Sequence, residues 1–100
     1  MRIEFHPEAL AEFEEAARYY KNCQEGLELR FIARVESALS QIQQAPERWL
    51  VFEEDVRRCL TRVFPYAVLF TVEMDFILII AVMHCYREPG YWHHRLKSKP

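Results

Sequence analysis

Three runs of β-branched and aromatic residues follow one another in residues 56–84, VRRCLTRVFPYAVLFTVEMDFILIIAVMH. This composition is typical of β-strands, and the runs cover residues 56–63, 66–73 and 76–84. Phe64-Pro65 separates the first pair and Met74-Asp75 the second. Because such short gaps join antiparallel neighbours, the stretch predicts three strands connected as hairpins.

The last of these strands is apolar at every position from Phe76 to Met83. A strand with two apolar faces has to be covered on both sides. We expect helices on one face and the C-terminal segment, residues 89–96, over part of the other. This strand is therefore predicted to lie in the interior of the sheet.

Two amphipathic helices precede the strands. Pro7 suits the first turn of a helix, and apolar residues then recur at three- and four-residue spacing, so we expect a helix over Pro7–Asn22. A second apolar stripe predicts a helix over Gly26–Ala45, which Pro46 terminates. The connection between them is short, so the pair is expected to form an antiparallel helical hairpin.

Together these elements predict an α+β fold in a single domain spanning residues 1–100. Alternation in residues 2–5 adds an N-terminal strand, and the helical hairpin packs on one face of an antiparallel sheet of about four strands, followed by a short C-terminal segment. Residues 46–55 remain as the one long connection. The predicted core comprises Leu10, Phe13, Tyr20, Phe31, Val35, Leu39, Ile42, Val68, Phe70 and Ile79.

Composition narrows the class of protein. A chain of 100 residues has room for one hydrophobic core, and its 51% of apolar residues excludes a disordered chain. The longest apolar run, residues 76–83, is far shorter than the stretch of about 20 residues that spans a bilayer, and the N-terminus lacks a signal-peptide segment. The three cysteines form no Cys-x-x-Cys pair, which suits reduced thiols. We therefore expect a cytoplasmic protein without membrane contact.

The charge is unevenly distributed along the chain. Residues 1–55 carry six Lys/Arg and twelve Asp/Glu, a net −6, whereas residues 56–100 carry seven and three, a net +4. Ten of the thirteen basic residues are arginine, which favours bidentate contacts. This balance does not suit a general nucleic-acid binder, but a C-terminal basic patch could meet an acidic partner or a short phosphodiester stretch.

Several motifs in the second half of the chain occur in a fixed order: Val56-Arg57-Arg58, Phe64-Pro65-Tyr66, Ala81-Val82-Met83-His84, and Arg87-Glu88-Pro89-Gly90-Tyr91-Trp92 followed by Arg95. With the order of the elements, they make the chain resemble the RelE/ParE superfamily of bacterial toxins, and it is more similar to the ParE, or plasmid-stabilisation, branch. The resemblance covers nearly the whole chain, from Phe5 to Arg95.

This resemblance implies the toxin of a type II toxin–antitoxin system, neutralised by a cognate antitoxin protein. It also implies DNA gyrase as the target, because ParE members poison gyrase. Other members of the superfamily cleave messenger RNA in the ribosome. We expect the antitoxin to cover the helical hairpin and an open edge of the sheet, since a disordered segment can add a strand and lay a helix in a groove.

RNA cleavage without a metal needs a base, an acid and cations near the phosphorus. Arg57, Arg62, His84 and Arg87 are the residues that could supply them. His84 could instead be a strand-end histidine satisfied by a backbone carbonyl. Arg57 and Arg58 point to opposite faces of their strand, so one of them could be a structural clamp on an acidic side chain.

One feature of the sequence disfavours the nuclease. RNA-cleaving members resemble one another in clustered lysines and arginines, whereas this chain has no lysine between Lys21 and Lys97. We therefore assign no catalytic residue and favour a protein that is not an enzyme. A ribosome-dependent messenger-RNA endoribonuclease stays the alternative, and so does a degenerate toxin that retains only antitoxin binding.

Aromatic and arginine side chains near the C-terminus are the candidate target-binding residues. Arg87, Tyr91, Trp92 and Arg95 combine the residue types that dominate protein interfaces. Trp92 could instead pack back on the sheet and close the core.

No metal or cofactor is expected. His84, Cys85, His93 and His94 match no common zinc spacing, and Cys85 would project to the face of its strand opposite His84. The chain also contains no glycine-rich phosphate loop.

Overall fold

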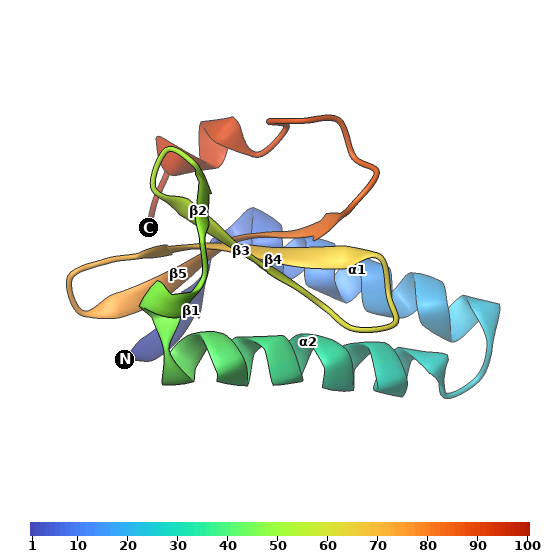
Figure 1. The fold of residues 1–100 in the computed structure, drawn as a ribbon. Coiled ribbons are helices and arrows are strands. Elements are labelled where there is room, and N and C mark those ends of the chain that lie inside the picture. The colour runs from blue at the N-terminus through green and yellow to red at the C-terminus, as the bar shows by residue number, and fades with distance from the viewer.

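The structure is a computed structural model that describes all 100 residues. Its elements, in chain order, are β1 (Arg2–Phe5), α1 (Pro7–Cys23), α2 (Leu27–Gln44), the 3-10 helix η1 (Pro46–Arg48), β2 (Val51–Glu53), β3 (Val56–Leu60), β4 (Tyr66–Val72), β5 (Phe76–His84) and the 3-10 helix η2 (His93–Leu96). Figure 1 shows α2 on one side of the sheet and the C-terminal segment on the other. The predicted α+β fold with a helical hairpin is confirmed.

The sheet has five strands in the order β1-β5-β4-β3-β2. The three predicted strands of residues 56–84 are present as antiparallel neighbours. The prediction of an antiparallel sheet was wrong for β1, which runs parallel to β5 with Phe5 opposite Ile79. Parallel neighbours are joined by long crossovers rather than hairpins, so no local turn signal indicates them.

The segment 46–55 was expected to be a connection, and this expectation was also wrong. It contains η1 and the short strand β2, which pairs antiparallel with β3 through Val51 and Arg57. A strand of three residues is too short to show a clear alternation of apolar and polar side chains.

Helix and strand ends follow the backbone conformations that their residues allow. Gly26 adopts φ +86°, a left-handed conformation that favours glycine, so α2 begins one residue later than expected. Strand β3 stops at Leu60, before the predicted end at residue 63, because Val63 has φ +77° in a turn. The hydroxyl of Thr61 donates to the carbonyls of Phe64 and Tyr66 and holds this turn.

The main core lies between the helices and one face of the sheet. Six of the ten predicted core residues are fully buried there: Phe31, Val35, Ile42, Val68, Phe70 and Ile79. Phe13, Tyr20 and Leu39 are partly buried against this core. Leu10 is 43% exposed, so its prediction was wrong; the buried stripe of α1 runs through Ala9 and Ala16 instead.

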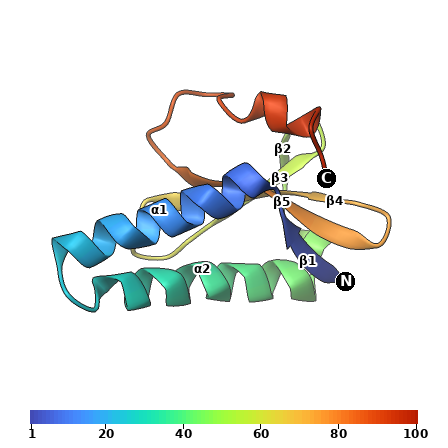
Figure 2. The same ribbon diagram turned by 180° about the vertical axis from the view of Figure 1, so that it is seen from behind.

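A second, smaller core covers the opposite face of the sheet, as the apolar pattern of β5 predicted. Leu78 and Ile80 of β5 pack there with Leu69 of β4 and with Trp92 from the C-terminal segment. Figure 2 shows this segment on the side of the sheet away from α2. None of the helices combines the length and the apolar composition needed to cross a bilayer.

Candidate functional site

The C-terminal segment after β5 folds back over the second face of the sheet (Figure 1). Trp92 anchors it, because this side chain is only 1% exposed and lies 5.9 Å from the ring of Phe52. Of the two alternatives for Trp92, the structure therefore shows the one in which this side chain packs back on the sheet. In this conformation the indole offers almost no surface to a partner.

Arg95 is also buried, in an ion pair with Glu12 of α1. Its Nη1 and Nη2 atoms lie 2.7 and 3.0 Å from the two carboxylate oxygens of Glu12. The side chain of Arg95 is 5% exposed and that of Glu12 is 16% exposed. Burial lowers the pKa of Arg95, but the hydrogen bond and charge of Glu12 outweigh it, so its net pKa lies above the ordinary value. Arg95 is thus charged and paired with the carboxylate of Glu12.

The same carboxylate has two further donors. Glu12 Oε1 accepts the backbone N–H of Val82 at 3.1 Å, and Oε2 accepts the hydroxyl of Tyr91 at 2.5 Å. Burial and this hydrogen bond to Glu12 raise the pKa of Tyr91 well above its ordinary value. Glu12 therefore connects α1, β5 and the C-terminal segment.

Arg87 and Tyr91 provide the exposed part of this region. The guanidinium carbon of Arg87 lies 3.9 Å from the centre of the Tyr91 ring, a cation–π contact. The side chain of Arg87 is 46% exposed and forms an ion pair with Glu88 at 3.5 Å. Of the four predicted target-binding residues, Arg87 faces solvent, Tyr91 is partly buried, and Trp92 and Arg95 lie beneath them.

A shallow concavity of about 250 Å³ lies beside Arg87, between α1 and the ends of β4 and β5. His84 lines it together with Arg87 and with Tyr66. His84 Nδ1 accepts the backbone N–H of Tyr86 at 3.1 Å, so its backbone partner is an amide rather than the expected carbonyl. Burial is the main reason that the pKa of Tyr66 is raised to about 12.

The four candidate nuclease residues do not converge on one site. His84 and Arg87 line the concavity, whereas Arg62 lines a different groove. Arg57 Nη1 donates to the backbone carbonyls of Trp49 and Glu47 at 2.6 and 3.2 Å. Arg57 is therefore a structural clamp, as one alternative held, but on carbonyls rather than on an acidic side chain.

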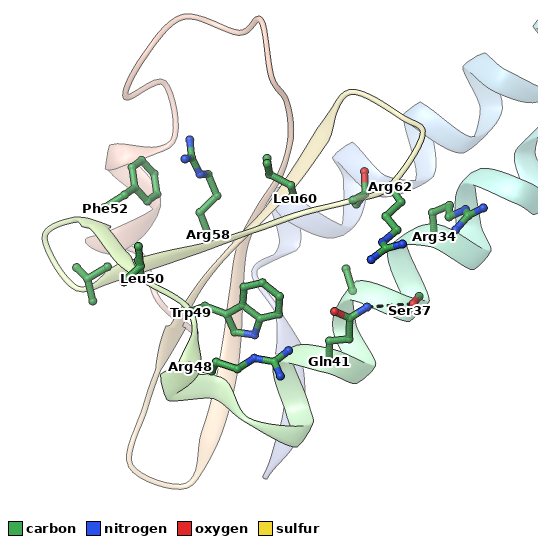
Figure 3. Close-up of a pocket in the computed structure, with 13 residues that line it drawn as sticks. Arg34, Ser37, Gln41, Arg48, Trp49, Leu50, Phe52, Arg58, Leu60 and Arg62 are labelled. Carbon is green, nitrogen blue, oxygen red and sulfur yellow. Dashed lines mark hydrogen bonds between the residues drawn. The ribbon is translucent and has the colours of Figure 1, made fainter.

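A groove of about 600 Å³ lies between α2 and the β2–β3 edge of the sheet (Figure 3). Its charged lining consists of four arginines without any acidic residue: Arg34, Arg48, Arg58 and Arg62. We call it the arginine groove.

Apolar side chains accompany the arginines in this groove. Leu50, Phe52 and Leu60 line it and are exposed. Arg58 lies over the ring of Phe52 at 5.3 Å and Arg48 over that of Trp49 at 5.0 Å. Figure 3 shows Arg34 and Arg62 together at one end of the groove and Arg58 with Phe52 at the other. The groove thus offers positive charge and apolar surface together.

Sequence reasoning missed Glu12 and the grouping of the four groove arginines. A signal for Glu12 appears only once the buried stripe of α1 is known, because Glu12 lies three residues after Ala9 and four before Ala16 on that stripe, whereas the sequence placed Leu10 in the core. An acidic residue on such a stripe needs a buried partner. No comparable signal connects Arg34 with Arg58, since they lie on different elements.

Comparisons with known proteins agree with the fold. A chain of the chromosomal ParDE toxin–antitoxin system from P. aeruginosa superposes with a TM-score of 0.72 at 17% identity, covering 84% of this chain and 95% of that one. At this identity the likeness shows the fold alone. No curated protein sequence matches significantly.

A sequence-family match goes further than the structural likeness. The family model for the ParE toxin of the type II toxin–antitoxin system parDE matches residues 3–89. The match begins within β1, includes the other four strands and both long helices, and ends in the segment after β5, so it covers most of the chain. The chain therefore belongs to the ParE toxin family of type II toxin–antitoxin systems.

Proposed function

We propose that this chain inhibits DNA gyrase by binding it, without cleaving RNA, and that a cognate antitoxin neutralises it. The observation that carries the proposal is membership of the ParE family over residues 3–89. Arg87 and Tyr91 are the residues proposed to contact the target, because a partly exposed arginine stacked on a tyrosine is typical of an interface hot spot. Trp92 and Arg95 are proposed to support them from below.

The placement of the candidate nuclease residues supports a function in binding. Stabilising a phosphorane-like transition state requires cations positioned together around one phosphate. Arg57 is already held by two backbone carbonyls, and Arg62 lies in the arginine groove, away from the concavity of His84 and Arg87. These four residues therefore do not bring an acid, a base and the cations together at one place.

Two assays separate the functions. Purified protein is added to gyrase in a DNA-supercoiling reaction and, separately, to translating ribosomes with messenger RNA. We expect inhibition of supercoiling and intact RNA, and in cells filamentation with a DNA-damage response. Cleavage of ribosome-bound RNA that is lost in Arg62→Ala or His84→Ala would establish the endoribonuclease instead. Binding to the antitoxin without any growth inhibition would identify a degenerate toxin.

The antitoxin is proposed to occupy the arginine groove and to pair with the open edge of β2. Four arginines in a lining without acidic residues suit an acidic segment, and the exposed Leu50 and Leu60 suit apolar residues on the same segment. Strand β2 pairs only with β3, so its other edge has free backbone groups that an added strand could use.

A charge reversal tests this docking site. The double variant Arg34→Glu/Arg62→Glu should weaken antitoxin binding by about tenfold or more in titration calorimetry. Arg18→Glu/Arg30→Glu is the matched control, because it makes the same charge change at two exposed helix arginines outside the groove. Equal affinities for both variants would place the antitoxin elsewhere.

A further inference from the structure

The Glu12 carboxylate joins parts of the chain that are far apart in sequence. Its four donors are the backbone N–H of Val82, the hydroxyl of Tyr91 and two nitrogens of Arg95, at sequence separations of 70, 79 and 83 residues. Each carboxylate oxygen accepts two of these hydrogen bonds. Glu12 thus connects α1, the edge of β5 and the C-terminal segment.

The ion pair also completes the edge of β5. Strand β1 pairs with β5 only from Phe76 to Ile79, so the following residues have free backbone groups on that edge. Arg95 Nη1 donates to the carbonyl of Ile80 at 3.0 Å, while Glu12 accepts from Val82. The two side chains thus replace the strand that is absent there. This ties the position of Arg95 to the sheet.

Stability alone gives a weak reason for this arrangement. The cost of desolvating the two charges offsets most of their attraction. Apolar side chains of similar volume often stabilise a core at least as much as a buried ion pair does. What a bidentate carboxylate–guanidinium pair adds is a fixed geometry. The ion pair also fixes the position of Tyr91, because the Tyr91 hydroxyl donates a hydrogen bond to Glu12 Oε2.

Tyr91 in turn holds Arg87. The Arg87 guanidinium carbon is 3.9 Å from the centre of the Tyr91 ring, and its other side-chain partner is the adjacent Glu88 at 3.5 Å. An arginine that is 46% exposed loses several side-chain rotamers when it binds a partner. A ring fixed from below restricts these rotamers in advance.

We propose that Glu12 is a positioning residue for target recognition: its carboxylate fixes Tyr91, and through Tyr91 it holds Arg87 in the orientation that binds the target. Glu12 itself is largely covered, with its side chain 16% exposed. This inference rests on the proposed role of Arg87 and Tyr91 in the toxin.

The test uses the full chain with Glu12→Gln, which keeps the shape of the side chain but removes its charge. Three readouts are taken: inhibition of growth on induction, inhibition of gyrase, and NMR relaxation of the Arg87 side-chain Nε–H, which reports its order on the picosecond–nanosecond scale. We expect growth and gyrase inhibition to weaken by about tenfold or more, with Arg87 becoming mobile. Antitoxin affinity should stay within about twofold, because the arginine groove lies at the β2–β3 edge of the sheet, whereas Glu12 contacts β5.

Two further variants distinguish a positioning role of Glu12 from a general loss of folding. Tyr91→Phe keeps the ring but removes the hydroxyl, and should mobilise Arg87 and weaken inhibition by about three- to tenfold. Glu14→Gln makes the same charge change at an exposed position of α1 and should leave every readout unchanged.

The outcomes separate this inference from the function on which it rests. If the wild-type chain does not inhibit gyrase, that target is wrong, while growth inhibition and Arg87 mobility still decide the role of Glu12. An ordered Arg87 in Glu12→Gln, or full toxicity of that variant, would overturn the inference. Loss of antitoxin binding in parallel with loss of toxicity would also overturn it, because Glu12 would then serve the fold as a whole.

Discussion

Arg57 Nη1 donates to the backbone carbonyl of Trp49 at 2.6 Å and thereby links β3 to the residue that follows η1. A second hydrogen bond reaches the carbonyl of Glu47 in η1 at 3.2 Å. One guanidinium therefore satisfies two carbonyls of the segment between α2 and β2. The shape of the arginine groove depends on this link, because Trp49 and its neighbours in β2 form one wall of the groove.

Replacing Arg57 by alanine should loosen the groove. We expect the free energy of unfolding to fall by about 1 to 3 kcal/mol, since hydrogen bonds from a charged donor are lost and one carbonyl is partly buried. Urea denaturation measures this change. Antitoxin affinity should fall as well, whereas Arg57→Lys, which can still reach one carbonyl, should retain part of both. Unchanged stability in Arg57→Ala would show that water replaces the guanidinium without cost.

Trp92→Ala should destabilise the second core. The indole is 1% exposed and packs against Leu78 and Ile80, so its removal leaves a cavity. We expect a loss of about 3 to 5 kcal/mol, measured by thermal or urea unfolding. Trp92→Phe should cost less because it fills part of the space. Any loss of toxicity in these variants is informative only at temperatures where they remain folded.

Gly90→Ala should strain the backbone at the start of the C-terminal segment. Gly90 has φ +76°, and an added Cβ would lie 2.6 Å from a ring carbon of His93. The His93 ring can rotate away, but the left-handed backbone conformation remains unfavourable for alanine, so we expect a loss of about 1 kcal/mol. Gly26→Ala is a useful comparison, because Gly26 also has positive φ but no atom within 4 Å of the added Cβ. If Gly90→Ala lowers the free energy of unfolding more than Gly26→Ala does, the difference measures the contact with His93.

Stability should decrease at alkaline pH. The pKa of Tyr66 is raised to about 12 in the folded chain, chiefly by burial. In the unfolded chain the pKa is about 10, so between about pH 10 and 12 the unfolded state loses its proton first and is favoured. The contribution of Tyr66 is therefore complete below about pH 10 and is lost as the pH rises toward about 12. Unfolding temperatures measured across this range should fall less steeply for Tyr66→Phe than for the wild type.

Local patterns in the chain were sufficient for the two long helices, for β1 and β3 to β5, and for most of the core, but not for η1 and β2. The spacing of Phe31, Val35 and Ile42 predicted the buried face of α2, because a helix brings such residues together whatever else surrounds it. The two apolar faces of β5 likewise predicted a cover on each side. The short motifs that end in Tyr91, Trp92 and Arg95 were enough to indicate the ParE family, because each motif is a run of neighbouring residues.

The prediction of target-binding residues was less complete. Residue type suggested Arg87, Tyr91, Trp92 and Arg95 as one group, since large aromatics and arginines prevail at interfaces. Burial of Trp92 was one of two alternatives for that residue, but the depths of the other three could not be predicted, because residues that follow a strand show no fixed periodicity. That these residues bind gyrase stays a prediction, which the supercoiling assay tests.

What the sequence by itself determined about this protein is its helices, its three consecutive antiparallel strands, its family and the residue types near its C-terminus. Each depends on residues close together in the chain. Only the tertiary structure decided that β1 is parallel to β5, that Glu12 pairs with Arg95, and that Arg34 and Arg48, from the acidic half of the chain, join Arg58 and Arg62 in one groove. These relationships arise where the packed sheet brings distant segments together, and hydrophobic periodicity carries no information about which distant segments meet.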